Sequence, residues 1–154
     1  MEARMKIMIA YDGSTYADAA LDDMRRAGLP READALIVSV GDGLVSTHSP
    51  VAEFAGTALT SRRVSSAIAV AREQALRLLA EARGFSEQAR RRLLSYFPGW
   101  EVETKVLEGS PSRELLQKAE TLQPDLIVVG SYGAHRRFVS TVLSRLGVQC
   151  FAPD

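Results

Sequence analysis

The chain of 154 residues lacks several features that would place it in a specialised class of protein. Its one cysteine, Cys150, can form neither an internal disulfide nor a four-thiolate metal site, so the fold must depend on its core. No segment approaches the roughly 18 apolar residues of a membrane helix, and the short apolar run near the N-terminus meets Asp12 too soon for a signal peptide. We therefore expect a cytoplasmic protein with no membrane partner.

An excess of charge is lacking too, because 19 Lys and Arg residues are balanced by 19 Asp and Glu residues. Nonspecific binding to nucleic acid depends on a net excess of cations, so we expect no nucleic-acid partner, although the balance leaves room for a local basic patch. The consecutive arginines at Arg90–Arg92 splay around a predicted helix, which favours a solvated face over such a patch.

Motifs that would indicate a particular chemistry are absent. The sequence contains neither of the phosphate-binding patterns G-x-x-x-x-G-K-[ST] and G-x-G-x-x-G, nor the G-x-S-x-G turn of nucleophilic hydrolases. His48 and His135 have no further His, Cys or carboxylate at metal-ligand spacing, so we expect no metal site. No side chain is placed as a general base, and we predict no catalytic residues.

What the chain does contain is four short apolar runs rich in branched residues. Runs of about 4–8 such residues are typical of strands covered on both faces in a parallel sheet. The predicted strands are Lys6–Tyr11, Ala35–Val40, Trp100–Leu107 and Leu126–Val129. The third run mixes apolar and charged residues, so we expect this strand to lie near an edge of the sheet.

Apolar residues at helical spacing follow each of these runs. The predicted helices are Thr15–Ala27, Ser61–Arg83, Glu87–Phe97, Ser110–Leu122 and Phe138–Gly147. Gly84, Phe85 and Ser86 are expected to interrupt or kink the chain between the second and third of these helices. For the fourth helix we expect Ser110 as the N-cap and Pro111 in the first turn.

The alternation of strands and helices predicts a single α/β domain over residues 1–154. We expect an open parallel sheet with right-handed crossovers and helices on both faces, in three layers. The one long stretch without periodicity, Gly41–Thr60, has the composition of a loop over one end of the sheet.

Ligands of such sheets bind at the carboxyl ends of the strands. Asp12 follows the first strand and could accept hydrogen bonds from a ribose or amino group, or it could simply cap the next helix. Gly130 and Gly133 follow the fourth strand, where their backbone amides and a helix N-terminus could approach a phosphate, with positive charge from His135–Arg137. The same glycines could equally make only a strand-to-helix turn beside a solvated face.

Over about residues 5–147 the chain resembles the universal stress protein family. The resemblance is carried by KIMIAYDGS at residues 6–14, ALIVSV at 35–40, VLEGSPSRELLQKAE at 106–120 and, most specifically, PDLIVVGSYG at 124–133. It implies a five-stranded parallel sheet in the order 3-2-1-4-5, commonly a homodimer, and a role in the stress response or signalling. One branch of the family binds ATP and carries the pattern G-x₂-G-x₉-G-[ST]; another does not bind it.

The resemblance implies an ATP site, with or without Mg²⁺. The residues that it assigns to the nucleotide are Ala10, Tyr11, Asp12, Val40, Gly130, Ser131, Gly133 and Ser144. The first three would lie by the base and ribose, Val40 would offer backbone contacts to adenine, and the last four would surround the phosphates. Leu143 replaces the third glycine of the pattern. One lost hydrogen bond to a charged group is worth about 1.5–3 kcal/mol, or about tenfold to a hundredfold in affinity.

Three functions stay open at this point. The first is an ATP-binding protein with slow hydrolysis or none. The second is an interaction or oligomerisation module whose vestigial phosphate site is filled by Leu143. The third is a nucleotidyl-transferring enzyme on a related fold, which is disfavoured because such enzymes would be expected to carry a His-rich signature where this chain has Asp12–Tyr16.

The C-terminal residues depart from the family pattern. After Gly147, only Val148–Phe151 could supply a fifth strand, so we expect this edge strand to be missing or reduced. Strand four would then have an uncovered edge, which invites pairing with another chain. We expect either an unusual homodimer or an edge covered by the terminal residues, and the chain could be a truncated part of a tandem protein.

Overall fold

A computed structural model describes residues 3–41 and 61–130 of the chain. Its elements are β1 (Met5–Ala10), α1 (Thr15–Met24), β2 (Ala33–Gly41), α3 (Ser61–Tyr96), β3 (Glu101–Glu108), α4 (Pro111–Leu122) and β4 (Leu126–Val129). The four strands form one parallel sheet in the order β3-β2-β1-β4. The predicted class and strand order are thus confirmed, and the third strand does lie at an edge. The expected fifth strand, the helix Phe138–Gly147 and the loop over residues 42–60 lie outside the described residues.

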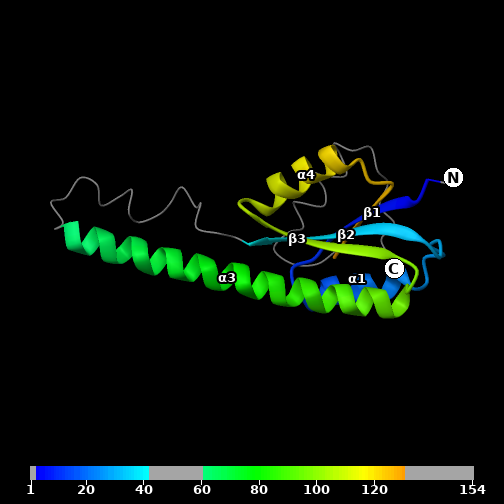
Figure 1. Cartoon of the computed structure of the whole chain (residues 1–154), viewed down its shortest axis with the longest axis horizontal. Coiled ribbons are helices and arrows are strands. Elements are labelled where there is room, and N and C mark those ends of the chain that lie inside the picture. Colours follow the sequence, from blue (N-terminus) through cyan, green and yellow to red (C-terminus); the bar gives the residue numbers. More distant parts are fainter. Residues whose placement is uncertain (1–2, 42–60, 131–154) are drawn as a thin grey trace.

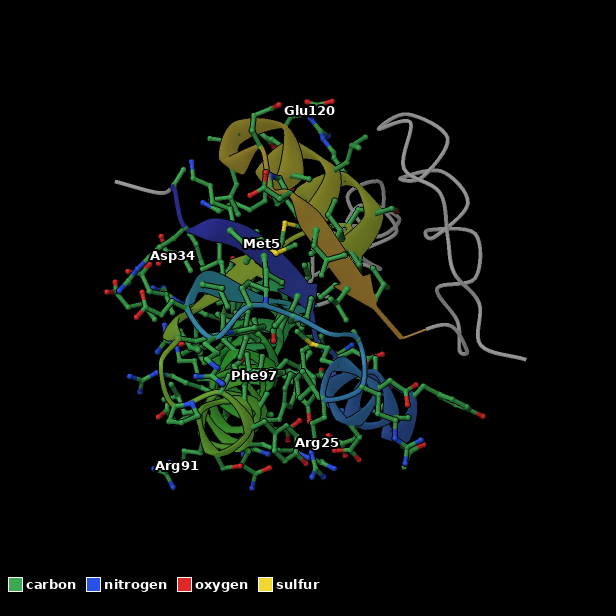
Figure 2. All side chains as sticks on the ribbon, turned by 90° about the vertical axis from the view of Figure 1, so that its right-hand side faces the viewer. Met5, Arg25, Asp34, Arg91, Phe97 and Glu120 are labelled. Atoms are coloured by element: carbon green, nitrogen blue, oxygen red, sulfur yellow. The ribbon has the colours of Figure 1, made fainter. Side chains whose placement is uncertain are left out.

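Helices cover both faces of this sheet. Figure 1 shows α4 on one side of the sheet and α1 with α3 on the other. In the view turned by 90°, Glu120 on α4 and Phe97 at the end of α3 lie on opposite sides of Met5 in β1 (Figure 2). The right-handed twist of a strand favours this placement of the crossover helices.

The alternation of side chains along β1 divides the core into two clusters. Ile7 and Ile9 point toward α1 and α3 and pack with Leu21 and Leu93, all fully or almost fully buried. Met8 points to the other face, where it packs in a cluster with Val38, Leu115 and Ala119. Both faces of β1 are therefore apolar, which explains why its sequence is a continuous apolar run.

The predicted interruption at Gly84–Ser86 is wrong, because α3 is one helix of 36 residues, Ser61–Tyr96. A glycine inside a helix costs about 1 kcal/mol relative to alanine, which is less than the helix gains by packing on the sheet. Ala82, Ala89 and Leu93 are buried on either side of the supposed break, and Ser86 is 1% exposed between them. The first turns of α3 extend past the sheet (Figure 1), where Ile68 is exposed.

The ends of two other helices differ in detail from the prediction. α1 ends at Met24 rather than Ala27, and the chain then turns through Gly28, whose φ of 68° is the left-handed conformation that glycine commonly adopts after a helix. Ser110 is the N-cap of α4 and Pro111 stands in its first turn, as predicted, although the Ser110 hydroxyl makes no capping hydrogen bond.

Candidate functional site

A pocket opens at the carboxyl ends of β1, β2 and β4, on the face of the sheet that α4 covers. It is lined by Ala10, Tyr11, Asp12, Ser14, Ala17, Val38, Val40, Pro111, Leu115, Val129 and Gly130. The cavity itself has a volume of about 50 Å³, and about 520 Å³ when the open space above it is included. A ligand larger than a few atoms would thus lie mostly across the mouth of the pocket.

The position of the pocket follows from the strand order. The chain leaves β1 toward β2 and β3 on one side, and it returns past them to place β4 on the other side of β1. Loops at the ends of β1 and β4 therefore diverge, and the crevice between such loops is where open parallel sheets bind ligands.

Five of the eight residues assigned to a nucleotide lie at this one pocket: Ala10, Tyr11, Asp12, Val40 and Gly130. The other three, Ser131, Gly133 and Ser144, lie outside the described residues, as do Leu143 and His135–Arg137. The structure thus places the four residues expected beside base and ribose in one pocket with Gly130, one of the four residues expected beside the phosphates.

The remaining lining residues were not predicted. Val38 lies two residues before Val40, so both side chains point to the same face of the sheet. Pro111 and Leu115 stand four residues apart at the start of the helix that covers this face. The two-residue period of the strand and the four-residue spacing on the helix are the sequence signals that indicate Val38, Pro111 and Leu115.

Residues 11–14, which we name the β1–α1 turn, form one wall of the pocket. Asp12 Oδ1 accepts a hydrogen bond from the backbone N–H of Ser14 at 2.9 Å, and Ser14 Oγ accepts one from the N–H of Ala17 at 3.2 Å. The N-cap of α1 is therefore Ser14. The capping role considered for Asp12 is wrong, and its exposed carboxylate instead holds the turn at the edge of the pocket.

Gly130 has a packing role that its sequence pattern did not reveal. A Cβ atom at this position would lie 3.0 Å from the backbone N of Ala17 and 3.0 Å from the carbonyl carbon of Tyr16. The end of β4 therefore passes directly against the first turn of α1, and a side chain at this position would force the neighbouring backbone to shift by a few tenths of an ångström. The packing of the fold thus favours glycine at position 130, whatever Gly130 does for a ligand.

Tyr11 belongs both to the pocket lining and to the hydrophobic core. Although it lines the pocket, its ring belongs to the core cluster under α1 and α3, where its hydroxyl donates to Asp18 Oδ1 at 2.6 Å. Burial, and then the hydrogen bond to the Asp18 carboxylate, raise the pKa of Tyr11 well above its ordinary value. The hydroxyl therefore remains a proton donor at neutral pH.

Arg92 of α3 continues this network across α1. Its guanidinium lies 3.1 Å from Asp18 Oδ1 and donates to both carboxylate oxygens of Asp22, at 2.8 and 2.7 Å. Asp22 Oδ1 also accepts a hydrogen bond from the Tyr96 hydroxyl at 2.6 Å. These charge-assisted contacts tie α1, and through Tyr11 the end of β1, to the C-terminal part of α3.

The charge of the pocket lining favours some chemical groups of a ligand over others. Asp12 is the one charged residue among the described lining residues, and the apolar part comes from strands and α4. Such a surface suits an uncharged ring and a hydroxyl-bearing group better than a phosphate. Among residues 3–41 and 61–130, no group of three His, Cys, Asp or Glu could hold a metal ion, and no helix is long and apolar enough to cross a membrane.

Comparison with known proteins gives a consistent result. The sequence model of the universal stress protein family matches residues 3–147 of the chain. Among curated proteins, no sequence matches. Several solved structures are similar in fold. One is the hypothetical protein MJ0577, with a TM-score of 0.67 and 20% identity; the alignment covers 92% of this chain and 89% of that chain.

Two further structures carry the family name. The universal stress protein UspA from Lactobacillus plantarum has a TM-score of 0.52 and 18% identity, over 93% of each chain. A universal stress protein in complex with cAMP has a TM-score of 0.51 and 15% identity, over 94% of this chain and 91% of that one. At these identities the similarity concerns the fold.

Proposed function

The chain belongs to the universal stress protein family, and on that premise we propose that it binds an adenine nucleotide, with ATP as the first candidate, in the pocket at the ends of β1, β2 and β4. The observation that carries the proposal is that residues from three separate segments of the chain line one pocket: Ala10, Tyr11 and Asp12, then Val40, then Gly130. A similar fold solved in complex with cAMP supports an adenine ligand.

The proposed pose follows from the chemistry of the lining. The adenine ring would lie against the apolar surface formed by Val38, Val40 and Leu115, and the Asp12 carboxylate would accept a hydrogen bond from a ribose hydroxyl. Because the cavity is only about 50 Å³, the nucleoside would lie across its mouth. Repulsion by the Asp12 carboxylate would direct the phosphates away from that residue. The phosphates would then be contacted by Gly130, Ser131, Gly133 and Ser144, as the family resemblance implies.

The proposed role is binding and signalling, with slow turnover or none. Asp12 is the one charged residue among the described lining residues, and a carboxylate held in the β1–α1 turn suits holding a ligand better than activating water. A cytoplasmic location, a homodimer and the use of Mg²⁺ with ATP are parts of the same proposal.

Leu143 favours one second candidate. If this residue fills the phosphate site, the chain is an interaction or oligomerisation module that has lost its ligand. The two candidates differ in whether the wild type binds nucleotide before the glycine of the ATP-binding pattern is restored.

Isothermal titration with Mg²⁺-ATP on nucleotide-free protein tests both candidates. We expect a submillimolar Kd for the wild type. Asp12→Ala should raise this Kd about tenfold or more, since one hydrogen bond to a charged group is worth about 1.5–3 kcal/mol. Asp23→Ala is the matched control, because Asp23 is an exposed carboxylate of α1 outside the pocket lining.

The Leu143→Gly variant separates the two candidates. Tighter binding than in the wild type would show that Leu143 weakens a working site. No heat from the wild type together with clear binding by Leu143→Gly would reject nucleotide binding as the native function and leave the interaction module. An equal rise in Kd for Asp12→Ala and Asp23→Ala would refute the proposed role of Asp12.

A further inference from the structure

Two adjacent residues in the C-terminal half of α3, Phe85 and Ser86, support the pocket from the opposite face of the sheet: Phe85 contacts the β1–α1 turn, and Ser86 contacts the end of β2. The ring of Phe85 packs against the β1–α1 turn, since a Cβ atom on Gly13 would lie 3.1 Å from its Cδ1 and Cγ atoms. The same ring lies 5.9 Å from the ring of Tyr11, centroid to centroid, at an interplanar angle of 54°. Phe85 therefore touches both sequence neighbours of Asp12.

Ser86 makes the corresponding contact with the other wall. Its hydroxyl lies 2.6 Å from the hydroxyl of Ser39 in β2, and both side chains are buried. Ser39 stands between Val38 and Val40, which both line the pocket. One short segment of α3 thus fixes the position of the β1–α1 turn and of the end of β2.

The backbone of the turn makes this contact specific. Gly13 has a φ of 76°, in the left-handed region that glycine favours, and its α-carbon can face the Phe85 ring only because it carries no side chain. With Tyr11 and Gly13 both packed against one ring, the backbone of Asp12 between them is held in place, and the hydrogen bond from the Ser14 N–H orients its carboxylate. A rigid support of this kind lowers the entropy lost when a ligand binds.

We propose that Phe85 is a positioning residue of the ligand pocket, which holds the β1–α1 turn so that Asp12 meets the ligand. The Ser39–Ser86 hydrogen bond holds the end of β2 in the same way. The proposal rests on the proposed function for the identity of the ligand, an adenine nucleotide. Phe85 itself is not among the residues that line the pocket, so it acts through Tyr11 and Gly13.

Two measurements on the same variants test this proposal. The first, which needs no ligand, is hydrogen exchange by NMR at the amides of Ser14 and Ala17, whose hydrogen bonds define the turn. The second is the Kd for Mg²⁺-ATP. Phe85→Ala should accelerate exchange at these amides at least tenfold and raise the Kd about tenfold, whereas Phe85→Leu, which keeps apolar bulk, should remain within about threefold of the wild type.

Leu93→Ala is the matched control, because Leu93 is a fully buried residue of the same helix and the same core cluster two turns further on. It should destabilise the protein but change neither the Kd nor the relative exchange of the two amides. Equal acceleration in Phe85→Ala and Leu93→Ala, or no acceleration in either, would overturn the proposal.

Two complications have defined outcomes. If Phe85→Ala does not fold, Phe85→Val against Leu93→Val gives the same comparison. If the wild type binds no nucleotide, the proposed function fails, and the exchange measurement still decides whether Phe85 holds the turn.

Discussion

The glycine at the end of β4 offers a direct test of whether packing or ligand binding explains its presence. In Gly130→Ala, the new methyl group would lie 3.0–3.1 Å from three backbone atoms of Tyr16 and Ala17, and none of these can rotate away as a side chain could. α1 or β4 must move by several tenths of an ångström. Overpacking of this kind costs about 1–3 kcal/mol. For a chain of this size we therefore expect the melting temperature to fall by about 2–10 °C.

Gly84→Ala supplies a control with the same chemical change. Gly84 lies in α3, and a Cβ atom there would meet nothing within 4 Å. Alanine should therefore stabilise the helix by about 0.5–1 kcal/mol. Both substitutions reduce the freedom of the unfolded chain equally, so the difference between them isolates the contact in the folded state.

The measurement is urea unfolding followed by circular dichroism, without nucleotide. We expect the two variants to shift the midpoint in opposite directions. If Gly130→Ala were as stable as the wild type, the close approach of β4 to α1 would be refuted, and the glycine would need another explanation. A normal midpoint combined with lost nucleotide binding would assign Gly130 to the ligand alone.

Three further predictions concern polar contacts between elements. Ser86→Ala should lower the free energy of unfolding by about 1–3 kcal/mol, because it leaves the buried hydroxyl of Ser39 without its partner at 2.6 Å. In urea unfolding, the double variant with Ser39→Ala should lose less stability than the sum of the two single variants. Hydrogen bonds from Tyr96 and Arg92 hold the pKa of Asp22 below its ordinary value. The contribution of Asp22 to folding stability is therefore present above about pH 4 and is lost as acid protonates its carboxylate in the folded state. Below that pH, Asp22→Asn should lose stability less steeply than the wild type. Trp100→Phe removes the 2.9 Å hydrogen bond from the indole Nε1–H to the carbonyl of Pro30 and should cost about 1 kcal/mol, or about 2–4 °C in a thermal melt; an unchanged melting temperature would show that this bond contributes nothing.

The sequence predicted most of the sheet because the determinants of the sheet are local. β1 and β2 are nearly continuous apolar runs, since helices cover both faces of each strand. The charged residues of the third run indicate an edge strand, and β3 indeed lies at one edge of the sheet, with five of its eight residues exposed. Alternation of strands and helices then left few topologies to consider.

The long helix shows where local reasoning failed. Glycine is a poor helix former, which predicts a break at Gly84, but its cost of about 1 kcal/mol is small beside the burial of Ala82 and Leu93 on the same helix. Phe85 and Ser86 then appeared to belong to a turn. Their actual partners, Gly13 and Ser39, are distant in the sequence, and no local pattern indicates such contacts.

The candidate site was predictable to a similar extent. Asp12 and Gly130 were found because each directly follows an apolar strand, and the carboxyl ends of parallel strands meet at one edge of the sheet. The support behind them was not found. Arg92 was treated as part of a solvated arginine run, yet it binds Asp22 from 70 positions away in the sequence.

The central position of β1 has a consequence for how the chain is made. Its partner β4 follows more than a hundred residues later, and the two are joined by the hydrogen bond from Lys6 N–H to Asp125, 119 positions apart. At a synthesis rate of about 5–20 residues per second, β1 is synthesised roughly 6–24 s before β4. During that interval the apolar segment MKIMIA has one unpaired edge. The nascent chain therefore depends on early pairing of β1 with β2, and on protection of its other edge, to avoid aggregation before synthesis is complete.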